Sequence, residues 1–170
     1  MTDELEPPRQ PLLGEATIVL RAPTQAWSSR TGAIGEHPID GVYFSDPRIV
    51  ALLDARFDGR HGETIATVPP GSDAIDFVSV LRHLDDGMPD PRVRAVHTRH
   101  ATATGIEERI TVPSGLPNPI ETEIVVRLAA DLAGMDGVKS GMGAAPIEIE
   151  IADTGARWGN ESVSAELRTD

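Results

Sequence analysis

The chain has 170 residues, a formal net charge of −12 and no cysteine. This length fits one domain that can bury its core without disulfides or a structural metal. The negative charge would repel DNA and RNA phosphates, which excludes nucleic acid as a partner, and the lack of cysteine excludes a disulfide framework and a thiol nucleophile.

The beginning of the chain predicts neither export nor a membrane anchor. The first ten residues, MTDELEPPRQ, are acidic and rich in proline, whereas a signal peptide starts with positive charge and continues with an apolar run. No later stretch reaches the roughly 18 uninterrupted apolar residues of a membrane span. We therefore expect no membrane partner and a location in the reducing cytoplasm. Residues 1–14 lack periodicity and predict a disordered acidic, Pro-rich tail before a folded domain over residues 15–170.

Beyond the tail, the dominant pattern is the period-two alternation of apolar and polar residues that is typical of strands. Gly/Pro-rich turns such as Pro69-Pro70-Gly71 separate the alternating runs. The fold class predicted is therefore all-β, a single antiparallel β-sandwich of the supersandwich-like kind. The predicted strands cover residues 16–21, 49–57, 63–68, 76–82, 92–100, 106–112, 120–128, 147–151 and 162–167.

One of these strands has a helical alternative. Residues 49–57 carry Ile49, Leu52 and Leu53 at helical spacing. However, Asp58-Gly59 follows immediately and is a hairpin signal, so a strand that turns back into residues 63–68 is the interpretation we favour.

Histidine and glutamate pairs are candidates for metal binding or acid–base chemistry. On a strand, His97 and His100 point to opposite faces, and no third ligand accompanies them, so we predict no metal site. Glu107 and Glu108 are adjacent and diverge in the same way, although folding could bring another carboxylate near one of them. No cofactor motif is present, and we expect none.

The few aromatic residues leave two functions open. Sugar-binding modules stack sugar rings on exposed aromatic side chains, and Trp27, Tyr43 and Trp158 are the candidates for such stacking. Tryptophans in a chain that is only 4% aromatic more often belong to the core or to an interdomain surface.

The short stretch GVYFSDPR, residues 41–48, ends in two opposite charges. If the strand continues through them, Asp46 and Arg48 leave the same face, while Pro47 interrupts ladder pairing. An Arg–carboxylate contact here would brace a strand end or hold a neighbouring loop. We interpret Asp46 and Arg48 as a structural or interface clasp and predict no catalytic role for either.

This stretch also carries a resemblance to a known family. Gly41–Leu52 resembles the Gly-x-Phe-x-x-Asp-Thr-Arg-x-Leu-Ser signature of the N-terminal domain of bacterial glycogen debranching enzymes of the amylo-alpha-1,6-glucosidase type. Asp58-Gly59, Gly105–Val112 and Arg127–Gly141 resemble three further blocks of that domain in the same order. Pro47 and Leu132 depart from the family pattern, which has Thr and Phe there.

The resemblance implies a β-sandwich that precedes an (α/α)6 toroid carrying the catalytic carboxylates. Residues 1–170 lack the long helical pattern of a toroid, so the chain alone is not expected to hydrolyse alpha-1,6 linkages. The leading hypothesis is a noncatalytic domain whose partner is that helical catalytic domain. The alternatives are a freestanding module that binds an alpha-glucan, and an enzyme that uses Glu107 or Glu108. A second copy of the chain is another candidate partner, because large apolar patches seldom stay bare.

Overall fold

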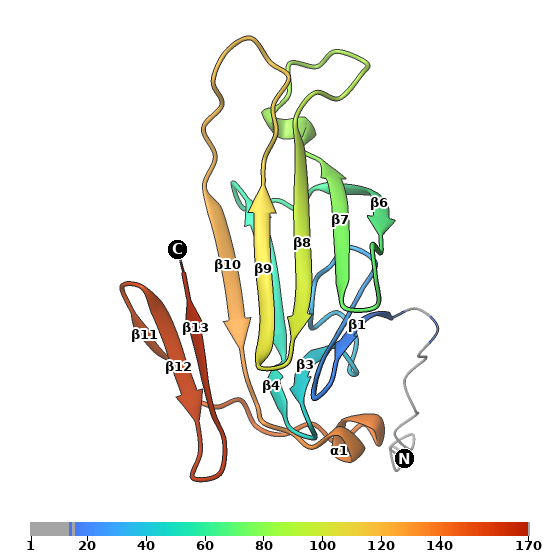
Figure 1. The fold of residues 1–170 in the computed structure, drawn as a ribbon. Helices are drawn as coiled ribbons and strands as arrows, with labels where there is room; N and C mark the ends of the chain where they lie inside the picture. The colour runs from blue at the N-terminus through green and yellow to red at the C-terminus, as the bar shows by residue number, and fades with distance from the viewer. Residues whose placement is uncertain (1–13, 15, 170) are drawn as a thin grey trace, which may run out of the picture.

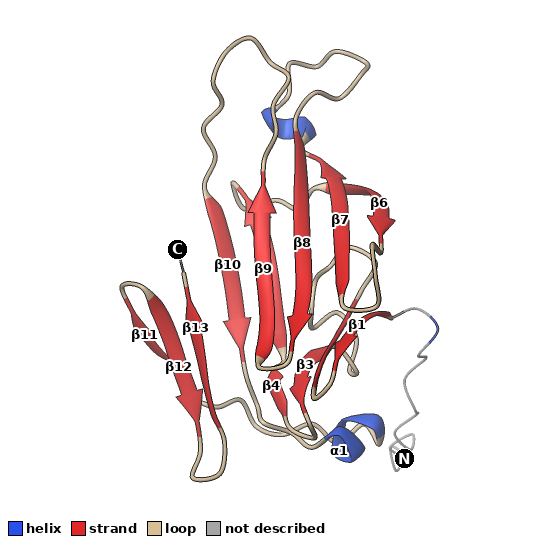
Figure 2. Cartoon of the chain, viewed as in Figure 1, coloured by secondary structure: helices blue, strands red, loops and turns tan. Residues whose placement is uncertain are grey.

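The computed structural model describes residue 14 and residues 16–169. Apart from Gly14, the predicted tail over residues 1–14 lies outside the described residues. The strands are β1 (Thr17–Arg21), β2 (Thr24–Ser28), β3 (Gly41–Phe44), β4 (Arg48–Val50), β5 (Leu52–Phe57), β6 (Glu63–Val68), β7 (Ala74–Val80), β8 (Arg94–Thr102), β9 (Gly105–Thr111), β10 (Ile124–Ala129), β11 (Glu150–Ala152), β12 (Gly155–Gly159) and β13 (Ser164–Arg168). Two short helices, η2 (Arg82–Leu84) and α1 (Met135–Lys139), accompany them, and Figure 2 shows how little of the fold they occupy.

Two antiparallel layers form the body of the domain (Figure 1). One layer has the strand order β6-β7-β8-β9, and the other combines the sheet β1-β2-β3-β4 with the pair β10-β5. The second layer is continuous because the backbone N–H groups of Ala51 and Arg48 donate to Ala129 O and Ala133 O, each at 2.8 Å. The chain after β10 therefore runs along β4. These layers confirm the predicted all-β sandwich.

A three-stranded meander, β11-β12-β13, packs beside the two layers. Ala156 and Trp158 of β12 point into the main core cluster, and Trp158 Nε1 donates to Ile49 O at 2.8 Å. The apolar side of the meander is therefore buried, while Arg157, between them, stays exposed.

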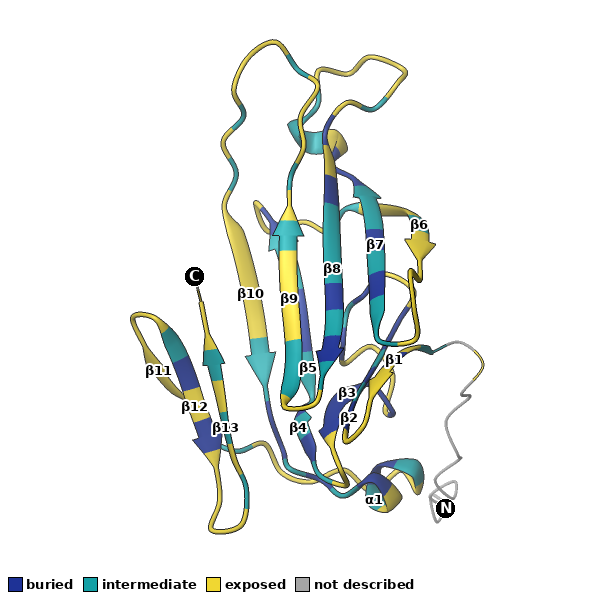
Figure 3. Ribbon diagram, in the orientation of Figure 1, coloured by how far each residue is buried: buried dark blue, intermediate teal, exposed yellow. Residues whose placement is uncertain are grey.

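The core follows the alternation of the sequence (Figure 3). Phe77 and Leu81 are 2% and 0% exposed, in agreement with the shared face predicted for them. Residues 49–57 are extended, as predicted, with a break at Ala51 between β4 and β5. The predicted strands at 120–128 and 147–151 form only from Ile124 and Glu150. Sequence reasoning missed β2, β12 and α1.

In the part of the chain that the structure describes, no helix has the length and apolar character needed to cross a membrane.

Candidate functional site

A buried ion pair lies where β4 meets the segment after β10. The Arg48 guanidinium donates from Nε to Asp131 Oδ1 at 3.1 Å and from Nη2 to Asp131 Oδ2, which makes the pair bidentate. Only 10% of the Arg48 side chain and 7% of the Asp131 side chain are exposed. A pair this well covered is shielded from salt and solvent, unlike an ordinary surface ion pair.

The same guanidinium holds a loop. Its Nη1 donates to Pro38 O at 2.8 Å and to Asp40 O at 3.2 Å. A Cβ at Gly41 would lie 2.5 Å from Arg48 Cδ. Residue 41 therefore has to be glycine to leave room for the aliphatic part of the Arg48 side chain. We call the contacts of Arg48 with Asp131, Pro38 and Asp40 the clasp. From here on, this name replaces the predicted clasp of Asp46 and Arg48.

Two further side chains fix this loop from inside. Asp40 Oδ2 accepts from the N–H groups of His37 and Gly35 at 2.9 and 3.3 Å, and the Tyr43 hydroxyl donates to Ile39 O at 2.8 Å. Residues 35–38 between these anchors are exposed. The result is an exposed loop tip on a rigid, buried base.

The pKa values of Asp40, Tyr43 and Arg48 depart from their ordinary values, and burial acts on each of them. It raises the pKa of Asp40, because the N–H groups of His37 and Gly35 offset its desolvation only in part, and it raises the pKa of Tyr43 to about 12. Burial lowers the pKa of Arg48, but the hydrogen bonds and charge of Asp131 outweigh it, so the pKa lies above its ordinary value. Arg48 stays charged and Tyr43 stays neutral at pH 7, which suits a structural network.

The partner of Arg48 differs from the one that the sequence suggested. Asp46 does not pair with Arg48; its Oδ1 accepts from Met135 N at 3.2 Å at the start of α1. The left-handed backbone at Ser45, with φ of 59°, and Pro47 turn the chain between β3 and β4, so Asp46 faces the helix and Arg48 faces inward. Asp46 and Arg48 thus hold the same region, 131–135, through separate contacts.

The aromatic candidates for sugar stacking are largely covered. Tyr43 is 0% and Trp158 is 7% exposed, so neither offers a free ring face, although Trp158 borders an open groove of about 840 Å³ on the meander. Trp27 is half-buried and packs against the cluster of Tyr43 and α1. Stacking on a sugar requires an exposed ring face, and sugar stacking by these aromatic residues stays a prediction.

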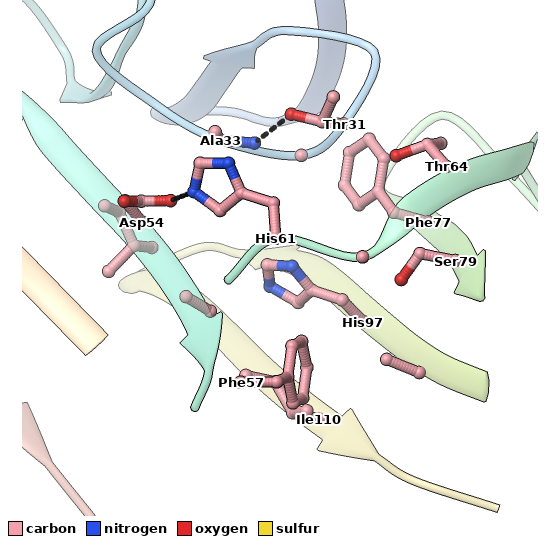
Figure 4. A pocket seen from close by; sticks show the side chains of 15 residues that line it. Thr31, Ala33, Asp54, Phe57, His61, Thr64, Phe77, Ser79, His97 and Ile110 are labelled. Carbon is pink, nitrogen blue, oxygen red and sulfur yellow. Dashed lines mark hydrogen bonds and ion pairs between the residues drawn. The ribbon is translucent and has the colours of Figure 1, made fainter. Parts of the chain in front are cut away.

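A second polar cluster lines a small cavity between the layers (Figure 4). The cavity has a volume of about 50 Å³, enough for a few water molecules but far below the roughly 300–1,000 Å³ of ligand pockets. His61 and His97 lie at this cavity (Figure 4), and His61 Nε2 is 2.8 Å from Asp54 Oδ1. No group of three or more potential metal ligands occurs among the described residues.

Behind the cavity, Arg99 ties β8 to β9 and to the opposite layer. The Arg99 side chain is 1% exposed; its Nη2 donates to Gly32 O at 2.8 Å and its Nε donates to Glu108. His97 also contacts Glu108. His100 lies on the opposite face, near Asp73 and Glu107, as its spacing from His97 predicts. Glu107 and Glu108 therefore lie on opposite faces of β9 and have separate surroundings.

Acid is expected to destabilise the domain through this second cluster. Burial would raise the pKa of Glu108, but the charge of Arg99 and the contact with His97 bring it below its ordinary value. Arg56 and His61 likewise outweigh burial at Asp54 and lower its pKa. Both groups bind protons less readily in the folded than in the unfolded state. Their stabilisation is therefore complete above the unfolded pKa values, about 4.3 for a glutamate and about 3.9 for an aspartate, and is lost as the pH falls through the folded pKa values.

Urea unfolding between pH 7 and pH 3 measures this effect. We expect Glu108→Gln to flatten the acid limb of the stability profile, and Glu107→Gln, at a side chain that is 76% exposed, to leave it unchanged. Parallel profiles for the wild type and Glu108→Gln would contradict the prediction.

Sequence reasoning missed Asp131, Asp40 and Arg99. Asp131 lies inside the segment that resembles the family, yet no spacing rule connects it with Arg48, 83 residues away. Arg99 lies between His97 and His100 in the sequence, and the alternation of a strand does not distinguish a buried arginine from an exposed one.

Most of the chain matches a model of a known protein family. The family model described as the N-terminal domain of some glycogen debranching enzymes matches residues 19–169. Neither the curated proteins nor the solved structures provide a match to this chain.

Proposed function

Since the chain belongs to the family of N-terminal domains of some glycogen debranching enzymes, we propose that it is a noncatalytic accessory domain that packs against and supports a helical catalytic domain. The catalytic partner is proposed to be an (α/α)6 toroid with amylo-alpha-1,6-glucosidase activity. The lack of cysteine agrees with a cytoplasmic location, which we propose for the whole enzyme.

The clasp is the observation that carries this proposal. A buried ion pair adds little net stability, because desolvation of the two charges offsets their attraction, and its best-attested use is to fix one arrangement among several. Here the arrangement fixed is the loop whose exposed tip is Gly35-Glu36-His37-Pro38. A loop positioned by a rigid scaffold is the usual place for recognition, so we assign the tip to the contact with the catalytic domain.

The ionisable groups support a noncatalytic role. Arg48 with Asp131 and Arg99 with Glu108 are paired, and the cavity near His97 is too small for a sugar. A glycosidase needs two carboxyl groups roughly 5–10 Å apart across its substrate, and neither cluster opens to a space that would hold one.

A binding assay with the helical catalytic domain of a debranching enzyme tests the proposal. We expect the 170-residue chain to bind that domain and raise its melting temperature, and we expect Glu36→Ala/His37→Ala to weaken binding at least about tenfold, since a central contact residue contributes about 1–2 kcal/mol or more. Asp153→Ala, at an exposed turn of the meander, is the matched control. No binding, or binding that ignores the loop variant, would refute the assignment.

The same preparation distinguishes the glucan-binding alternative. We expect no heat signal on titrating the chain alone with a branched glucan or linear maltooligosaccharides, and no hydrolysis of either. Binding without turnover would favour a freestanding glucan-binding module instead.

A further inference from the structure

The first half of the edge strand β10 is apolar and exposed. Ile124, Val125 and Val126 are 41%, 40% and 50% exposed, and Figure 3 shows the upper part of β10 as exposed. Among the described residues, β10 pairs only with β5. An exposed apolar edge of this kind is a template for pairing with another strand.

The hydrogen-bond pattern between β10 and β5 shows which residues of β10 direct their backbone N–H and C=O groups to the free edge. Glu123 O accepts from Asp58 N at 2.9 Å, across to the β5 side. Because alternate residues of an antiparallel strand direct their backbone groups to opposite sides, the odd-numbered residues face β5 and the even-numbered ones face outward. Ala130 confirms this phase, since its O accepts from Ile147 N at 2.9 Å on the outer side. Ile124, Val126 and Leu128 therefore present their N–H and C=O groups to the outside.

We propose that this edge joins two copies of the chain in a symmetric antiparallel dimer, with Ile124 opposite the partner's Ile124. The layers that contain β10 in the two copies then form one continuous sheet. The two-fold axis of such a ladder can pass through an even-numbered residue, which exchanges both hydrogen bonds with its copy, or through an odd-numbered residue, whose even-numbered neighbours form the hydrogen-bonded pairs.

Side-chain chemistry selects Ile124 among these centres. This register places Glu121 opposite the partner's Arg127, and by symmetry Arg127 opposite the partner's Glu121, so two opposite-charge pairs form. It also places Ile120 opposite the partner's Leu128. A register centred on Val125 would also form opposite-charge pairs, between Glu123 and the partner's Arg127, but it would set Thr122 instead of Ile120 against the partner's Leu128. A register centred on Val126 would set Arg127 against the partner's Val125 and would form no opposite-charge pair.

The inward faces agree with this pairing. Ile124 and Val126 lie opposite Phe57 and Ala55 in the register of β10 with β5, and Phe57 and Ala55 line the interlayer cavity. Ile124 and Val126 therefore belong to the inner face and are exposed only because the layer ends there. A second copy would continue the layer and cover them. One edge contact buries little area and each chain carries a net charge of −12, so the dimer is weak and concentration-dependent.

Charge reversal and complementation test the register. Sedimentation equilibrium of the full chain at physiological ionic strength should give a dimer whose dissociation constant rises about fivefold in Glu121→Lys and in Arg127→Glu, because each variant sets like charges opposite each other. An equimolar mixture of the two variants should restore the wild-type value. In the mixed dimer the introduced lysine of one chain faces the introduced glutamate of the other, and the two unchanged residues at these positions also form an opposite-charge pair. Misfolding of either variant cannot produce such a recovery.

Glu161→Lys, an identical charge change at an exposed residue of the meander, is the control and should leave the dissociation constant unchanged. A chain that is monomeric at every concentration reached would overturn the proposal. So would a dimer that the two variants leave intact, or a mixture without recovery.

Discussion

Arg48→Ala is expected to destabilise the domain by about 3–5 kcal/mol, because it leaves the Asp131 carboxylate buried without a counter-charge. Asp131 is only 7% exposed at its side chain, and the carbonyl groups of Pro38 and Asp40 lose a donor at the same time. For a domain of this size, the melting temperature should fall by roughly 6–20 °C. Thermal unfolding followed by circular dichroism measures the change.

Three variants separate the clasp from a general effect of removing arginine. Arg157→Ala removes a side chain that is 74% exposed and should change stability by less than about 0.5 kcal/mol. Asp46→Asn should cost no more than about 1 kcal/mol, since Asp46 accepts one backbone hydrogen bond and does not pair with Arg48. Arg48→Met/Asp131→Leu should recover most of the loss, because neither member of the ion pair is left as an unpaired buried charge. An unchanged melting temperature in Arg48→Ala would show that the clasp has no structural role.

Arg99→Met is expected to cost about 2–3 kcal/mol. The guanidinium is fully buried, contacts Glu108 and Gly32 O, and lies 5.5 Å from the centre of the Phe77 ring. The cost is below that of Arg48→Ala because 21% of the Glu108 side chain is exposed, so water partly solvates the carboxylate that is left behind.

The pH dependence identifies the cause of this loss. Without Arg99, burial raises the pKa of Glu108 with less opposition, so the variant should unfold at a higher pH than the wild type during acid titration. Arg109→Met, on the exposed face of β9, is the control and should follow the wild-type profile. An acid midpoint in Arg99→Met equal to that of the wild type would mean that Arg99 does not govern Glu108.

The fold was predictable where alternation was strong. Residues 76–82 and 92–100 alternate over a long run with turn residues at their ends, and both form strands. By contrast, β2 is Thr-Gln-Ala-Trp-Ser and buries two hydroxyl residues, Thr24 at 0% and Ser28 at 1% exposure, so its inward face lacks the apolar pattern that marks a strand. β12 begins and ends with glycine, which indicates a turn in a sequence.

The candidate site was predictable only for residues that are close together in the sequence. The sequence places Asp46 and Arg48 together and indicates a structural contact, but the partner of Arg48 depends on a tertiary contact between β4 and the segment after β10. Leu132, with φ of 52°, adopts a backbone conformation that is rare for a branched side chain, and no propensity predicts it.

The distance along the chain between Arg48 and Asp131 also constrains how the domain forms during translation. The two residues are 83 positions apart, and at about 5–20 residues per second the ribosome needs roughly 4–17 s to deliver Asp131 after Arg48. Throughout that interval the guanidinium has no buried carboxylate to meet. The layer that contains β4 therefore closes only after β10 has left the ribosome, and a nascent chain stalled before residue 131 should be sensitive to protease.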